Sequence, residues 1–325
     1  MSALVFLKLV AIFAVVAIGW GVARSGRLGS GDAARVLSGA AFYIFVPALL
    51  FRTTARIDFA RLDARLLVAF FVPTIALIAL VYAASRRSQY AEAGAVAEPS
   101  IRAITASFGN AVQIGIPLAA ALYGETGLAL HLSVVSFHSL ILLTVLTALV
   151  ELDLARAQRR EGQDKARLAR MLAVTVRNTI IHPVVLPVLA GLAWNATGVA
   201  LPVLADEVLA TLGQAVVPLC LVLIGVSLAH YAVRGALPGA IALAALKLVV
   251  EPLAVFAFAR GALGLTGMPL AIVVMMAALP VGSNALIFAQ RYRALEGETS
   301  TAIVVSTLAF VVTAPLWLAL LHTFG

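Results

Sequence analysis

Two apolar stretches of the sequence contain helix-breaking and amide-bearing residues that a membrane-spanning helix rarely carries. The first, residues 109–124, contains Gly109, Asn110, Gln113 and Pro117. The second, residues 278–292, contains Pro280, Gly282, Ser283 and Asn284. Glycine and proline weaken a helix, and an amide in hydrocarbon is costly unless it has a partner. Interrupted spans at matching places in two halves of a membrane protein indicate the binding site of a transporter.

An interruption of this kind has a definite chemistry. The half-helix after the break begins with unpaired N–H groups and a partial positive charge, so a carboxylate in the gap finds donors there. We expect the side chains that contact the carboxylate to be Asn110, Gln113, Ser283 and Asn284. We expect the crossover itself to be formed by Gly109, Pro117, Pro280 and Gly282. In the competing interpretation, the prolines are ordinary membrane-helix prolines and the asparagines join neighbouring helices.

A further pair of residues would place charge at membrane depth. Lys247 and Glu251 are four residues apart in an apolar window, so they share one face of a helix. Ionisable groups in mid-membrane usually face a cavity or a partner. Lys247 would then offset the charge of an anionic substrate while Glu251 exchanges a proton. In the alternative interpretation, the two side chains only neutralise each other.

Other residues indicate less. His131 and His138 are seven residues apart and could titrate as a pair, although such histidines are more often hydrogen-bonded within a bundle. The motifs of a zinc protease and of a serine hydrolase are absent from the sequence, and no span holds paired aspartates, which argues against an enzyme. The single Cys220 excludes an intramolecular disulfide. We expect no cofactor beyond a coupling ion, H+ or Na+.

The elements that hold these residues must lie in lipid. Of the 325 residues, 62% are hydrophobic and 12% are charged, whereas a soluble domain carries roughly 25% charged residues. The net charge of +8 fits basic loops that fix membrane orientation better than a nucleic-acid partner. Ten windows can span a bilayer: 3–23, 34–52, 65–85, 101–123, 127–150, 171–194, 206–230, 236–259, 268–290 and 300–323.

The hydrophilic stretch 151–170 divides the chain into two halves of five spans each, 1–150 and 171–325. Three features recur between the halves at offsets of 171 to 174 residues: Gly124-Glu125-Thr126 and Gly297-Glu298-Thr299, Trp20 and Trp194, Pro47 and Pro218. A duplicated unit with an odd number of spans must invert, so we predict an all-α membrane protein with an inverted repeat. Most Lys and Arg residues fall in inside loops when both termini lie outside and the central loop is cytoplasmic.

Three segments resemble the auxin efflux carrier family, which includes plant carriers and bacterial malonate-type permeases. The run from Asn110 with Tyr123-Gly124 resembles the fourth helix of that family, and Val46-Pro47 to Phe51 resembles its second. Ala278 to Gly282, with Phe288, Tyr292 and Ser300 to Ala302, resembles its ninth helix and the start of its tenth. The chain departs from plant members in having Gly109 where they have proline, and in lacking an acidic residue in the third span.

The resemblance implies ten helices in two inverted repeats, with helices four and nine broken and crossing near the midplane. It implies that helices 1, 2, 6 and 7 form a scaffold and that helices 3–5 and 8–10 form a transport core. It also implies transport of small organic anions by an elevator-type movement, in a homodimer in a bacterial-type inner membrane. A membrane anion sensor or a channel is the alternative, and saturable flux would distinguish a carrier from a channel.

Overall fold

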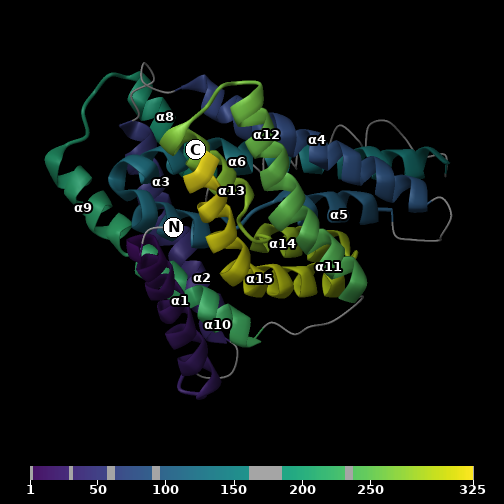
Figure 1. Cartoon of the computed structure of the whole chain (residues 1–325), viewed down its shortest axis with the longest axis horizontal. Helices are drawn as coiled ribbons and strands as arrows, with labels where there is room; N and C mark the ends of the chain where they lie inside the picture. Colours follow the sequence, from purple (N-terminus) through teal and green to yellow (C-terminus); the bar gives the residue numbers. More distant parts are fainter. Residues whose placement is uncertain are drawn as a thin grey trace.

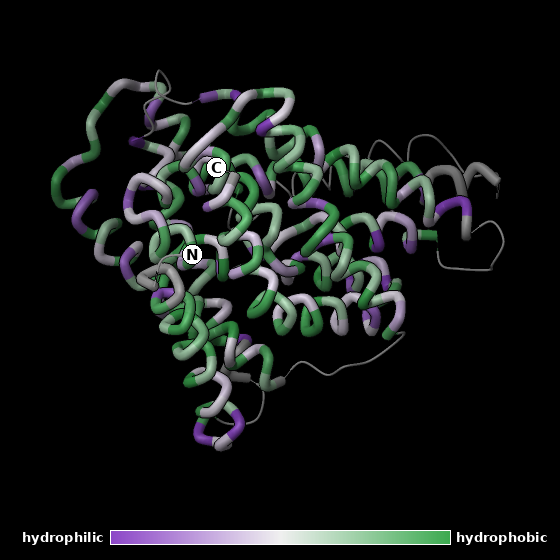
Figure 2. Tube along the Cα trace, in the orientation of Figure 1, coloured by the Kyte–Doolittle hydropathy of each residue, from purple (hydrophilic) through white to green (hydrophobic). Residues whose placement is uncertain are grey.

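The computed structural model describes six parts of the chain, residues 3–28, 32–56, 63–89, 96–160, 185–230 and 237–324. Within these parts the backbone is helical almost throughout. Seven of the described helices are long and apolar enough to cross a membrane, and two shorter apolar helices accompany them. Hydrophobic residues run along most helices, while hydrophilic residues gather mainly at helix ends and turns (Figure 2). The prediction of an all-helical membrane protein is confirmed.

The first half of the chain contains α1 (Ala3–Arg24), α2 (Asp32–Ala40), η1 (Ala41–Phe45), α3 (Val46–Ala55), α4 (Ala64–Gln89), α5 (Glu98–Ser107), η2 (Ala111–Gly115) and α6 (Ile116–Arg160). The second half contains α8 (Val185–Ala196), α9 (Val203–Gln214), α10 (Val216–His230), α11 (Leu237–Ala245), η3 (Leu246–Val250), α12 (Glu251–Gly261), α13 (Gly267–Ala277), α14 (Ser283–Tyr292) and α15 (Glu296–Phe324). The η segments are π-helical and all others are α-helical.

The helices differ from the ten predicted spans at three places. The fourth and fifth predicted spans run together in α6, where Gly124 makes a kink with φ 66° and ψ −157° that favours glycine. The ninth is divided between α13 and α14. The sixth falls partly outside the described residues, which resume at residue 185. The ten-helix inverted repeat therefore stays a prediction.

The central loop also begins later than the sequence indicates. α6 continues without a break past Val150 to Arg160, so the helix extends into the stretch 151–170 that the sequence assigns to a loop. The segment from 151 to 160 is rich in Leu, Ala, Glu and Arg, which are good helix formers, so its charges do not end the helix. The rest of the predicted loop lies outside the described residues.

Each π-helical segment precedes a proline by the same spacing. Pro47, Pro117 and Pro252 each stand two residues after the end of η1, η2 and η3. Proline has no N–H, and its ring displaces the carbonyl four residues earlier. The turn widens in response, so that an N–H bonds the carbonyl five residues back: Val46 to Ala41, Gly115 to Asn110, and Glu251 to Leu246.

The widened turns leave backbone carbonyls for partners on other helices. The carbonyl of Leu248, four residues before Pro252, accepts a hydrogen bond from Trp317 Nε1 of α15 at 2.8 Å. The carbonyl of Ala111 in η2 accepts from His131 Nε2 at 2.9 Å. Both bonds satisfy carbonyls that would otherwise be unpaired in an apolar interior. Local helix distortion is thereby converted into contact between helices.

The helices contact one another in two sets (Figure 1). In one set α1 packs along α10, and α3 packs against α8 and α9. In the other, α4 packs against α5 and α12, α11 against α15, and α12 against α13. Residues Leu270–Ala277 of α13 are all buried, so this helix lies at the centre of the second set. The sets touch where α10 meets η2 and α1 meets α6.

Candidate functional site

Two membrane-spanning windows contain a short stretch that is not helical. Residues 108–110 separate α5 from η2, and residues 278–282 separate α13 from α14. Both stretches are almost wholly buried. Each break ends one helix and begins another, so four helix termini come together inside the protein and their unpaired backbone groups need partners.

The two stretches satisfy part of this need by pairing with each other. The N–H of Asn110 donates to the carbonyl of Pro280, and the N–H of Gly282 donates to the carbonyl of Phe108, both at 2.8 Å. Together they make a short antiparallel bridge between Gly109 and Val281. The two bonds are related by a single offset, because 282 − 110 and 280 − 108 both equal 172.

Glycine is required where the backbones cross. A Cβ on Gly282 would lie 2.8 Å from the carbonyl oxygen of Gly109, which is too close for any side chain. A Cβ on Gly109 would lie 3.3 Å from Cε and Nζ of Lys247. Of the predicted crossover residues, Gly109, Gly282 and Pro280 lie at the contact. Pro117 lies beyond it in α6, where it accompanies the widened turn of η2.

Asn110 is held in place by Gln113. Its Oδ1 accepts a hydrogen bond from the Gln113 N–H at 3.2 Å, which caps η2, and its Nδ2 donates to Gln113 Oε1 at 3.1 Å. Gln113 is buried, and it does not line the cavity described next. It therefore orients Asn110, whose amide nitrogen carries a second hydrogen that can donate to a ligand.

A cavity of about 30 Å³ lies at the crossing. Its polar lining residues are Asn110, His138, Ser139, Ser283 and Asn284, and its aromatic ones are Phe42 and Phe108. Three of the four predicted substrate-contacting residues thus face one space. Because a buried water needs roughly 10–15 Å³ by this measure, the cavity holds about two waters and is too small for an organic acid in this conformation.

Lys247 and Glu251 lie behind the crossing. Both are fully buried, with Lys247 Nζ 2.8 Å from Glu251 Oε2. Lys247 Nζ also donates to the carbonyl of Ala277, the last residue of α13. Thr74 of α4 donates to Glu251 Oε1 at 3.0 Å. Lys247 thus touches one interruption at Gly109 and the other at Ala277, so that its charge lies close to the cavity without lining it.

Two residues at the cavity were not predicted from the sequence. Phe42 reaches it from η1, and His138 reaches it from the part of α6 beyond the kink. A histidine or phenylalanine in an apolar helix carries no local signal that it will face a polar space. Their arrival depends on how distant helices pack, and only the unpaired polarity of His138 in an apolar window could have drawn attention to it.

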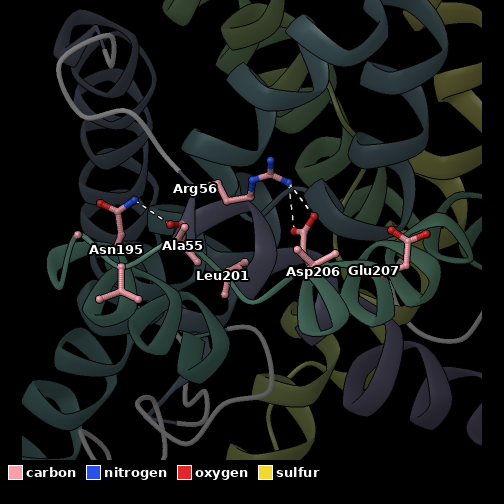
Figure 3. A pocket seen from close by; sticks show the side chains of 10 residues that line it. Ala55, Arg56, Asn195, Leu201, Asp206 and Glu207 are labelled. Carbon is pink, nitrogen blue, oxygen red and sulfur yellow. Dashed lines mark hydrogen bonds and ion pairs between the residues drawn. The ribbon is translucent and has the colours of Figure 1, made fainter.

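A larger hollow of about 420 Å³ lies elsewhere, between α3, α8 and α9 (Figure 3). Its cation, Arg56, is paired with Asp206 at 3.1 Å, and Arg52 binds the same carboxylate at 2.8 Å. Glu207 adds a further negative charge to its lining. An incoming anion would have to compete with these carboxylates, so this hollow is a poorer anion site than the crossing.

Comparison with known proteins agrees with this organisation. The family described as membrane transport protein matches residues 4–318. A protein of Rhizobium meliloti (strain 1021) named "Putative malonate transporter" is 26% identical over 277 residues, which cover 83% of this chain and 82% of that protein. Because the family match extends over nearly the whole sequence, the chain belongs to the membrane transport protein family, the auxin efflux carrier family that its interrupted spans resemble.

Proposed function

We propose that this membrane transport protein is a secondary transporter of small organic anions, such as malonate or auxin-like carboxylic acids, that bind where the two interruptions cross. One observation carries the proposal: Asn110, Ser283 and Asn284 line a single cavity although 173 residues separate Asn110 from Ser283. The relative named for malonate supports the carboxylate class.

The backbone around this cavity suits an anion. α14 begins at Ser283, and its first internal bond runs from the Ala285 N–H to the Gly282 carbonyl, so the N–H groups of Ser283 and Asn284 precede the bonded turns. Helix N-termini favour negative charge through such donors and through the helix dipole. The buried Lys247 ammonium adds positive potential behind Gly109. Neutral donors then bind the carboxylate directly while the cation stays paired with Glu251.

We further propose alternating access by an elevator-type movement. The contacts between helices support a scaffold of α1, α2, α3, α8, α9 and α10 and a core formed by the remaining helices. Phe42, on the scaffold side, covers the cavity in the core. An apolar hollow of about 340 Å³ lies between α1 and α10 on one side and α6 and α15 on the other, so packing along this boundary is incomplete. Movement of the core away from Phe42 would open the cavity.

The single offset of 172 residues in the two crossing bonds supports an inverted repeat of five spans. We infer that the protein lies in a bacterial-type inner membrane as a homodimer, with both termini outside. Coupling is proposed to use H+ through Glu251 or, failing that, Na+. An unchanged pH profile of transport in Glu251→Gln would reject the proton role.

The central experiment is transport of radiolabelled malonate and aromatic acids by the full-length protein in proteoliposomes. Asn110→Ala and Asn284→Ala should each lower transport about tenfold or more, because each removes a charge-assisted hydrogen bond to the carboxylate. Asn195→Ala is the matched control, since Asn195 binds the Ala55 carbonyl far from the crossing. If both site variants insert normally and transport at the wild-type rate, the binding site lies elsewhere.

A further inference from the structure

His138 is the one polar ring at the crossing that the interruptions do not themselves supply. It comes from α6 and is 2% exposed. Its imidazole packs between the rings of Phe108 and Phe70, at centroid distances of 4.5 Å and 5.7 Å. These aromatic neighbours fix the position of the ring and offer it no conventional hydrogen-bond acceptor.

The Nε2 atom of His138 has no hydrogen-bond partner in the part of the chain that the structure describes. His131, one face-matched heptad earlier on the same helix, is equally buried but bonds the Ala111 carbonyl through its Nε2. The bundle therefore satisfies one histidine and leaves the other open. Buried polar groups without a partner are uncommon in native proteins, so each needs an explanation such as a water or a ligand.

His138 also lines the crossover cavity, together with its neighbour Ser139. The charged groups that act on it are Lys247 of η3 and His131 of α6. The nearby carboxylate of Glu251 is already bound by Lys247 and Thr74. The surroundings of His138 are thus biased toward positive potential, which favours an anion as the missing partner over a cation.

The cavity consequently has two separate sources of hydrogen bonds. Asn110, Ser283 and Asn284 come from the interruptions, whereas His138 and Ser139 come from the distal part of α6. We propose that His138 hydrogen-bonds the second carboxylate of a short dicarboxylate whose first carboxylate lies at the crossing. His138 is then a specificity-determining residue that favours dicarboxylates over monocarboxylates. This inference rests on the proposed function and names the substrate class of the same site.

The test measures binding to the purified full-length protein by thermal stabilisation, with malonate as the dicarboxylate and acetate as the monocarboxylate at equal ionic strength. His138→Leu should weaken malonate binding about tenfold while changing acetate binding by less than about twofold, because only malonate loses a hydrogen bond. His138→Gln keeps a donor and should restore most of the malonate affinity. His131→Gln is the control on the same helix and should leave the malonate-to-acetate ratio unchanged.

A second measurement needs no folded leucine variant. In wild-type protein with ¹⁵N-labelled histidines, malonate should shift the His138 Nε2 resonance and acetate should not, the signal being assigned by its loss in His138→Gln. An equal malonate-to-acetate ratio in wild type and His138→Leu, or an Nε2 signal indifferent to malonate, overturns the inference and leaves a water as the partner of His138. If no carboxylate stabilises even the wild-type protein, the proposed function itself fails.

Discussion

The two interruptions use the same backbone pairing but are held in different ways. Around residues 108–110, the supporting groups come from the same half of the chain and lie close in sequence. Asn110 caps η2 and bonds Gln113, and His131 binds the carbonyl of Ala111. The first interruption is therefore organised largely by its own sequence neighbourhood, with its polar side chains already engaged.

The interruption at residues 278–282 depends on other helices. The N–H of Val281 donates to Ser306 Oγ of α15 at 3.1 Å, and the carbonyl of Ala277 is bound by Lys247. α14 has no side-chain cap, and Ser283 and Asn284 make no side-chain hydrogen bond to the described residues. The comparison suggests a division of labour in which the first interruption supplies a rigid frame and the second supplies free donors.

The largest expected effect comes from the residue that both interruptions share. Lys247→Met removes one partner of a fully buried ion pair and should lower the free energy of unfolding by about 3–5 kcal/mol, because the Glu251 carboxylate is left uncompensated. Thermal or denaturant unfolding in detergent measures this loss. The double variant Lys247→Met, Glu251→Gln should recover part of it, since no unpaired charge remains. A single variant as stable as the wild type would show that the pair is not buried as described.

A smaller effect distinguishes the two crossing glycines. Gly282→Ala should cost about 1–3 kcal/mol of stability, because its methyl group meets the backbone of Gly109, which cannot move without breaking the bridge. Gly109→Ala should cost less, because its methyl group meets the end of a lysine side chain. Unfolding of both variants in the same detergent gives the comparison.

The control for this pair is Gly21→Ala in α1. Nothing lies within 4 Å of the added methyl group there. Alanine should therefore leave stability unchanged or raise it by about 0.5–1 kcal/mol, since it favours the helix over glycine. Equal losses for Gly109→Ala and Gly282→Ala would mean that the two interruptions are equally constrained.

The smallest effect concerns the second interruption alone. Ser306→Ala removes the acceptor of the Val281 N–H and should lower stability by about 1 kcal/mol, through one unpaired buried donor. Ser136→Ala is the control, since Ser136 bonds only a carbonyl of its own helix. If transport as well as stability falls in Ser306→Ala, the position of Val281 matters for the site. A loss no larger than in the control would show that α15 does not hold the second interruption.

Much of this arrangement is local in origin and could be predicted. The apolar composition requires a membrane fold, and the helices end beside Gly109 and Pro280, as the weakness of glycine and proline in helices suggests. The four-residue spacing of Lys247 and Glu251 brings their charges together in the structure. Each of these features is decided by residues within one or two turns of each other.

The remainder depends on packing between distant segments. Nothing near Phe42 or His138 in sequence indicates that they reach the crossing, because helices far apart in the chain bring them there. Gln113 looked equivalent to Asn110 as a donor to substrate. Its three-residue spacing instead lets it bond Asn110 and turn away from the cavity, a choice between two satisfactory partners that composition cannot decide.

The wide turns before Pro117 and Pro252 have one more consequence. Successive residues advance by about 100° around an α-helix, so a turn that holds one surplus residue rotates everything after it by more than a quarter of a revolution. A single helical wheel drawn through residues 237–261 would therefore misplace one end relative to the other. Deleting a residue inside η3 should realign the two ends, so the proline-associated turn works as a phase shifter that lets one rod present unrelated faces at its two ends.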